Sequence, residues 1–275
     1  MECLYLDKNS GKCLNSNDAR YNCVHCAGSV FDGENEIITK DFSEEVYFAP
    51  WIGKEYEKAN YFGRKVLVLG NSHYCRNEDL KICGEAYAKC AQCGHCIKQL
   101  YSECCYSTID VVGYYITEIE TPWTALKVVS ALDDDSLMKN DCNKSVRDSI
   151  AFYNYVQESL ADGSSVPDRN QCRQSESAYF EVLEKLRPEL VIALGTSHMF
   201  DTDMPNDNYE NGNPVSLDGN RIKHGYYSLK DGTRIHTVWI RHPSARGAYD
   251  YLYWNKAIQL AKESEYTRIK ERKNA

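Results

Sequence analysis

Short apolar runs, separated by polar loops and amphipathic segments, dominate the hydrophobic pattern of this chain. Each run is four to eight residues long and rich in β-branched, aromatic or leucine side chains, as in strands buried on both faces; they lie at 66–69, 149–156, 190–194 and 235–240. Helix-like spacing of apolar residues occurs at 108–132, at about 175–186 and at 249–261. Pro122 must break or kink the first of these helices. A hairpin is expected at 226–233, and the charged residues past 262 are expected to fray. This alternation predicts an α/β protein, a three-layer α/β/α sandwich with a central four-stranded, mainly parallel sheet.

The chain divides into two parts by composition. Residues 1–40 are polar, rich in Asn, Asp and Gly, and carry too few large apolar side chains to bury a core unaided. Residues 41–275 hold all the predicted strands and helices, with a cysteine-dense insertion at 75–105. We therefore expect a cysteine-rich, metal-binding N-terminal segment followed by one α/β domain.

Composition and charge narrow the class of protein. Apolar residues make up 43% and charged residues 26% of the 275 residues, which is ordinary for a globular protein. No apolar run approaches the roughly 20 residues that span a bilayer, and the start Met1-Glu2-Cys3 lacks the basic and apolar regions of a signal peptide. We expect a cytoplasmic monomer without a membrane partner. The net charge of −8 argues against a nonspecific polyanion binder, although it leaves room for a local basic groove.

Polar side chains follow the predicted strands at the point where each strand ends. The first strand runs into Gly70-Asn71-Ser72-His73-Tyr74, and the fourth into His242-Pro243-Ser244. The carboxyl ends of parallel strands meet at one edge of a sheet, which is where ligands bind in open α/β folds. Gly70, Asn154, Gly195 and His242 are therefore expected around a single cleft.

These motifs, in this order and strand context, resemble the uracil-DNA glycosylase superfamily over roughly residues 45–261. In one major branch of that superfamily the first motif is Gly-Gln-Asp-Pro-Tyr, where this chain has residues 70–74. An asparagine ends the family's second strand, as Asn154 does here. The family's leader Leu-x-Pro-x-x-Val-x-x-Leu-Gly is matched by residues 186–195, and its His-Pro-Ser motif by residues 242–244.

The resemblance implies a monofunctional DNA glycosylase. Such an enzyme hydrolyses the N-glycosidic bond of uracil, or of another modified or damaged base, after flipping the base out of DNA, and it leaves an abasic site. No lysine stands within the four motifs to form a Schiff base. The long insertions would also suit a base larger than uracil.

The resemblance also implies roles for the strand-end residues. His242 would donate a hydrogen bond to the leaving base and stabilise its negative charge. Asn154 would read one edge of the base, because an amide carries both a donor and an acceptor. Tyr74 would limit what fits at C5 of the base, and Gly70 would line the same pocket.

The first motif departs from the family, because Ser72 and Asn71 stand where relatives carry a water-positioning carboxylate. Asn71 is expected to orient the water through its amide oxygen, and His73 is the nearby group able to act as a base. The remaining motif residues are assigned to DNA. The small side chains of Ser72, Ser197 and Ser244 would allow the backbone to approach phosphates closely. His198 would hydrogen-bond within a loop or contact a phosphate. Arg246 would fill the gap that the flipped base leaves in the DNA.

Two other functions fit the same residues. A catalytically silent nucleic-acid-binding module could keep the pocket after losing the water-activating group. A hydrolase acting on free nucleosides would suit the acidic net charge. The sequence does not separate these alternatives from the glycosylase.

The 13 cysteines favour metal sites, since a reducing compartment disfavours disulfides. A tetrahedral structural Zn site is expected from the N-terminal set Cys3, Cys13, Cys23 and Cys26. A second set, completed by Cys83, Cys104 or Cys105, comprises Cys90, Cys93 and Cys96. Some superfamily members hold a 4Fe–4S cluster, for which Cys23, Cys26 and Cys172 are candidates here; this alternative ranks below zinc because only Cys172 fits the second pair of ligands.

Overall fold

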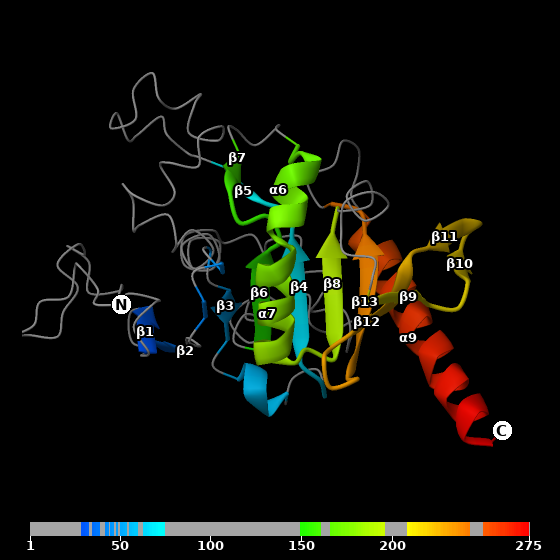
Figure 1. The fold of residues 1–275 in the computed structure, drawn as a ribbon. Coiled ribbons are helices and arrows are strands. Elements are labelled where there is room, and N and C mark those ends of the chain that lie inside the picture. The colour runs from blue at the N-terminus through cyan, green and yellow to red at the C-terminus, as the bar shows by residue number, and fades with distance from the viewer. Residues whose placement is uncertain are drawn as a thin grey trace, which may run out of the picture.

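The computed structural model describes residues 29–32, 35–38, 42–43, 45–46, 48, 50–53, 55–59, 63–74, 149–160, 166–195, 208–242 and 250–274. Their centre is a seven-stranded sheet with the strand order β3-β6-β4-β8-β13-β12-β9 (Figure 1). In that order the strands are Trp51–Ile52, Ile150–Asn154, Val66–Gly70, Leu190–Leu194, Arg234–Ile240, His224–Ser228 and Tyr209–Asn211.

The four predicted strands form the parallel part of this sheet. β4 pairs parallel with both β6 and β8, and β8 pairs parallel with β13. Three further strands extend the sheet in antiparallel pairing, β3 beside β6 and β12 and β9 beyond β13. The α/β class and the mainly parallel sheet are thus confirmed, whereas the predicted count of four strands covers only the parallel part. The added strands are short or partly polar, so they carry no long apolar run to reveal them.

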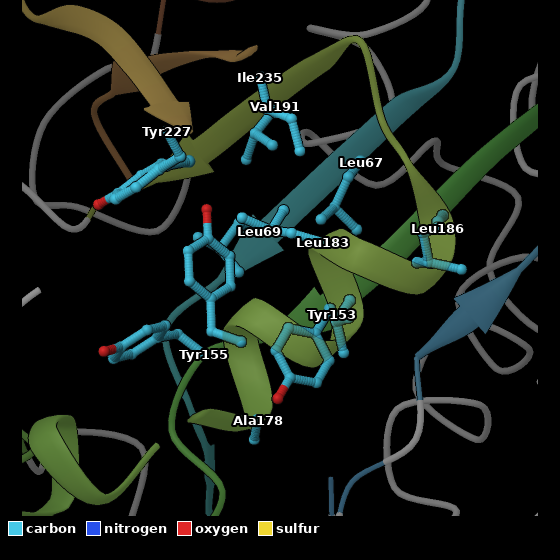
Figure 2. Packing of buried hydrophobic residues seen from close by; sticks show 14 of the residues in the cluster. Leu67, Leu69, Tyr153, Tyr155, Ala178, Leu183, Leu186, Val191, Tyr227 and Ile235 are labelled. Carbon is cyan, nitrogen blue, oxygen red and sulfur yellow. The ribbon is translucent and has the colours of Figure 1, made fainter. Parts of the chain in front are cut away.

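The main hydrophobic cluster lies between the sheet and α7 (Glu176–Leu186) (Figure 2). Leu67 and Leu69 of β4 meet the buried face of the helix, which presents Ala178, Tyr179, Val182, Leu183 and Leu186. Burying one such aliphatic side chain stabilises the fold by about 1.5–3 kcal/mol. Because side chains alternate along a strand, the residues between Leu67 and Leu69 and on either side of them face away from α7.

The helices begin and end at recognisable residues. The side chain of Asp168 caps α6 (Arg169–Gln174) by accepting from the backbone N–H groups of Asn170 and Gln171. In return, the Gln171 side chain accepts from the backbone N–H of Asp168, which completes a capping box. Arg187, the residue that caps the C-terminal end of α7, has a left-handed backbone conformation and directly precedes Pro188. The helix expected at 175–186 is therefore confirmed.

α9 (Tyr251–Asn274) is longer than expected. It starts within two residues of the expected position and continues to Asn274 where the sequence analysis expected fraying past 262. The segment 262–274 is rich in Lys, Glu and Arg and holds neither Gly nor Pro, so nothing in it ends a helix. Charged composition alone is not a reason for a helix to stop.

Smaller elements complete the described part of the chain. The expected hairpin is present as β12 and β13, joined by a turn at 229–233. Two more hairpins join β1 (Ser29–Asp32) to β2 (Asn35–Ile38) and β10 (Val215–Leu217) to β11 (Asn220–Ile222), and β5 (His73–Tyr74) pairs parallel with β7 (Ser159–Leu160). Among the described residues, no helix has the length and apolar character needed to cross a membrane.

Candidate functional site

Asn154 and Gly70 occupy paired positions at the carboxyl ends of β6 and β4. A Cβ added to Gly70 would lie 2.0 Å from Oδ1 of Asn154, so the amide oxygen occupies the space that a side chain would fill. Tyr153 and Tyr155 belong to the cluster under α7, which places Asn154 on the opposite side of the sheet. Glycine is required at position 70 because the asparagine side chain lies across it.

The other end of the Asn154 amide contacts His73. Its Nδ2 lies 2.9 Å from Nε2 of His73, and each residue is only 6% exposed. An amide nitrogen can only donate, so the imidazole nitrogen is the acceptor in this pair. The structure therefore engages Nε2 of His73 with the amide. With Nε2 accepting, Nδ1 of a neutral imidazole carries the proton, so this contact leaves neither ring nitrogen of His73 available for the role as a base that the sequence suggested.

Two residues without a sequence signal support this pair. The ring of Phe48 packs against the His73 ring with 4.6 Å between centroids. The Gln157 side chain accepts from the backbone N–H of Phe48 at 2.8 Å and donates to the backbone carbonyl of Asn154, also at 2.8 Å. Gln157 thus links the segment carrying Phe48 to the strand end carrying Asn154. Phe48 and Gln157 are 109 positions apart in the sequence, so no local pattern could have paired them.

The backbone of Asn71 continues the ladder between β4 and the segment after β6. Its carbonyl accepts from the backbone N–H of Val156 at 2.9 Å, next to the bond from Tyr155 N–H to the Gly70 carbonyl at 3.1 Å. The side-chain Oδ1 of Asn71 is buried and has no hydrogen-bond partner in the part of the chain that the structure describes. A buried amide oxygen of this kind is an acceptor site for a water molecule.

His242 follows β13 and lies against the end of β8. A Cβ added to Gly195 would lie 2.2 Å from Cβ and 2.8 Å from Cγ of His242. The backbone N–H of Gly195 donates to the Ile240 carbonyl at 2.8 Å, and the positive φ of 70° at Gly195 favours glycine. Burial lowers the pKa of His242 below its ordinary value of 6.5, so the neutral imidazole predominates at pH 7.

Both pairs lie at the same edge of the sheet. β4 and β8 are neighbouring parallel strands, and their carboxyl ends, marked by arrowheads in Figure 1, carry Gly70 and Gly195. Asn154 and His242 come from the strands that flank them on either side, β6 and β13. The structure thus brings Gly70, Asn154, Gly195 and His242, which the sequence analysis expected around a single cleft, to one edge of the sheet, with Asn71 and His73 beside them.

The other predicted site residues divide into two that the structure describes and four that lie outside the described residues. Tyr74, assigned to the base pocket, lies in β5, where its backbone pairs with Leu160. Four of the five residues assigned to DNA contact fall outside the described residues: Ser197, His198, Ser244 and Arg246. Ser72 is described and half-buried, immediately before β5.

The predicted zinc ligands also lie outside the described residues; they are Cys3, Cys13, Cys23, Cys26, Cys90, Cys93 and Cys96. Zinc therefore stays a prediction. Within the described ranges no three His, Cys, Asp or Glu side chains are grouped as a metal site. Cys172, the candidate for a 4Fe–4S cluster, is fully buried in the hydrophobic cluster, where its carbonyl accepts from the Tyr155 hydroxyl at 3.0 Å.

No model of a known protein family matches the chain, and no curated protein matches it.

Proposed function

We propose that this protein is a DNA glycosylase that hydrolyses the N-glycosidic bond of uracil or another modified base. The observation that carries the proposal is the pairing at one sheet edge of two polar side chains with two glycines. Asn154 lies over Gly70, and His242 lies against Gly195. This arrangement offers a base-reading amide and a hydrogen-bond donor on strands separated by only two others.

In the proposed mechanism His242 stabilises the departing base. Breaking the glycosidic bond leaves negative charge on the base, and a fixed N–H donor lowers the energy of that charge. Burial lowers the pKa of His242, so the group acts as a neutral imidazole that donates a hydrogen bond without first losing a proton. Its contact with Gly195 restricts where the ring can lie.

Asn154 reads the base in this proposal. His73 engages its Nδ2, which still has a second hydrogen to offer, and Oδ1 can accept. The base must first leave the DNA stack, which costs a few kcal/mol. A wrong base would leave the buried amide without its hydrogen bonds. Because burying unsatisfied polar groups is energetically costly, the site would bind such a base much more weakly.

Asn71 positions the attacking water. Its buried Oδ1 has no partner in the described part of the chain and can accept one hydrogen bond from a water molecule. An amide cannot take up a proton, so it orients the water and does not deprotonate it. The sugar's positive, oxocarbenium-like character makes an oriented neutral water a sufficient nucleophile. The oxygen of the water bonds to the sugar carbon as the bond to the base breaks, and the proton that the water loses passes to the released base anion.

The three-layer sandwich belongs to the same proposal, with α7 on one face of the sheet and α9 contributing to the other.

Oligonucleotides that each carry one altered base provide the test. Purified protein should produce alkali-labile abasic sites with at least one of them, and His242→Ala should lower the single-turnover rate by about 10²-fold. His242→Gln, which retains a donor, should recover part of that loss. Wild-type protein that binds the oligonucleotides without forming abasic sites would be a silent binding module. Release of base from free nucleosides alone would identify a nucleoside hydrolase.

A further inference from the structure

We propose that His73 is a positioning residue that fixes which way round the Asn154 amide lies, and so selects the hydrogen-bonding edge that the site accepts. The inference rests on the proposed function for its meaning and on the geometry of the pair for its evidence. It assigns His73 a role different from that of a base.

At the His73 end, the hydrogen bond couples the orientation of the amide to the tautomer of His73. Nδ2 of Asn154 faces Nε2 of His73 at 2.9 Å, and Nε2 can accept only as an unprotonated nitrogen. Neutral His73 must then carry its proton on Nδ1. If the amide turned over, its oxygen would face Nε2 and could accept from it only after the proton of His73 had moved from Nδ1 to Nε2. Both residues are 6% exposed, so water cannot readily satisfy either group.

The opposite end of the amide is fixed by Gly70. Oδ1 lies so close to the Gly70 backbone that an added Cβ would be 2.0 Å away. An oxygen accepts weakly from a backbone Cα–H in such a position, whereas an NH2 group would direct its own hydrogens at it. The contacts at the two ends favour the same orientation.

The His73 ring itself is held in place. Phe48 packs on it at 4.6 Å between centroids, and Gln157 fastens the backbone of Phe48 to that of Asn154. Two hydrogen bonds and one ring contact thus join His73 and Asn154 by a second route. The imidazole is consequently held beside the amide and does not rotate freely.

The orientation has a direct consequence for the base. Toward a bound base the amide would offer a donor on its His73 side and an acceptor on its Gly70 side. A base with a ring N–H beside a carbonyl, such as a 4-oxopyrimidine, complements this order. A 4-aminopyrimidine has the reverse order, and it would pair only with a turned amide.

The first experiment compares kcat/KM for uracil and cytosine in matched oligonucleotides. Gln at position 73 can donate or accept, so His73→Gln should let the amide take either orientation and lower the uracil-to-cytosine ratio at least ten-fold. His73→Glu, which only accepts when its carboxylate is ionised, should keep the wild-type ratio at a pH above the pKa of that carboxyl. His224→Gln is the matched control: His224 is another buried histidine of the sheet, 4% exposed, but it contacts His236 and the Asn213 carbonyl. That control should keep the ratio. An unchanged ratio in an active His73→Gln protein would overturn the proposal.

The second experiment needs neither a variant nor activity. Long-range ¹⁵N–¹H correlation spectra of the wild-type protein should show His73 with a protonated Nδ1 and an unprotonated Nε2. A proton on Nε2 would overturn the proposal whatever the enzyme cleaves. If the protein shows the expected tautomer but cleaves no base, the glycosylase proposal is wrong and the pairing of His73 with Asn154 still holds.

Discussion

The side chain of His242 lies directly against the backbone of Gly195, where an added Cβ would come within 2.2 Å of the histidine Cβ. The backbone of Gly195 also has φ of 70°, which disfavours any residue with a Cβ. A side chain at position 195 would therefore have two effects: it would strain the backbone, and it would displace His242.

Gly195→Ala should separate activity from stability. Displacing a positioned group by about 1 Å can cost about 10²-fold in rate, so we expect base release to slow by at least ten-fold. The matched control is Gly219→Ala, because Gly219 has a similar φ of 78° but no atom within 4 Å of an added Cβ. Both variants should lose about 1 kcal/mol or more of unfolding free energy through backbone strain. Equal activity in the two variants, measured as single-turnover rates, would show that Gly195 does not position His242 for catalysis.

The pH dependence of base release should reflect the burial of His242. Burial lowers the pKa of this group below 6.5, so its neutral form persists as the pH falls through that value. We expect the single-turnover rate to show no inflection at pH 6.5 that depends on His242. The comparison is with His242→Gln, which cannot titrate and should give a profile of the same shape from pH 6.5 to pH 8. An inflection near pH 6.5 in the wild type that disappears in the variant would contradict the neutral-imidazole role.

A buried pair of histidines on β12 and β13 should make the fold sensitive to acid. Nε2 of His224 donates to the Asn213 carbonyl at 2.6 Å, which leaves Nδ1 of neutral His224 to accept from Nε2 of His236 at 3.1 Å. His236 is 8% exposed and stacks on Tyr226. Burial lowers the pKa of His236 to about 3, helped by the charge that His224 acquires when it is protonated and by the positive charges of Arg64, Lys262 and Arg234.

The sign of the effect follows from the two pKa values. Above pH 6.5 His236 is neutral in both the folded and the unfolded chain and adds no pH dependence. Between pH 6.5 and about 3 the unfolded chain binds a proton that the folded chain does not, so stability falls as the pH falls. The contribution is on the order of 1 kcal/mol per pH unit. Urea unfolding of His236→Gln should show a shallower loss between pH 6 and pH 4 than the wild type, and parallel curves would refute this assignment.

Buried tyrosine hydroxyls should differ in their contribution to stability. The Tyr227 hydroxyl is buried without a hydrogen-bond partner in the described part of the chain, whereas the Tyr155 hydroxyl donates to the Cys172 carbonyl at 3.0 Å. Removing an unsatisfied buried polar group is neutral or favourable, and removing a satisfied one loses a bond worth about 1 kcal/mol. Tyr227→Phe should therefore keep or raise the unfolding free energy, and Tyr155→Phe should lower it by about 1 kcal/mol. Thermal or denaturant unfolding measures both, and a comparable loss in the two variants would disprove the distinction.

The sequence by itself determined the parallel part of the sheet and the edge where the candidate site lies. Strands buried on both faces are rich in apolar residues, so β4, β6 and β8 stand out without any tertiary information, as does the apolar end of β13 at 238–240. A residue that ends or follows such a run lies at the carboxyl end of the strand. Gly70, Asn154 and His242 are therefore expected at one edge of a parallel sheet.

Only the tertiary structure decided how those residues meet. His73 and Asn154 are 81 positions apart, and their hydrogen bond depends on the pairing of β4 with β6. The same holds for Gly195, whose contact with His242 requires the register of β8 against β13. The short antiparallel strands at the edges of the sheet are likewise held by pairing with a neighbour and carry little apolar pattern of their own. Local sequence encodes which backbone segments are buried, whereas the crossovers and strand register decide which side chains come into contact, because those distances depend on the whole chain.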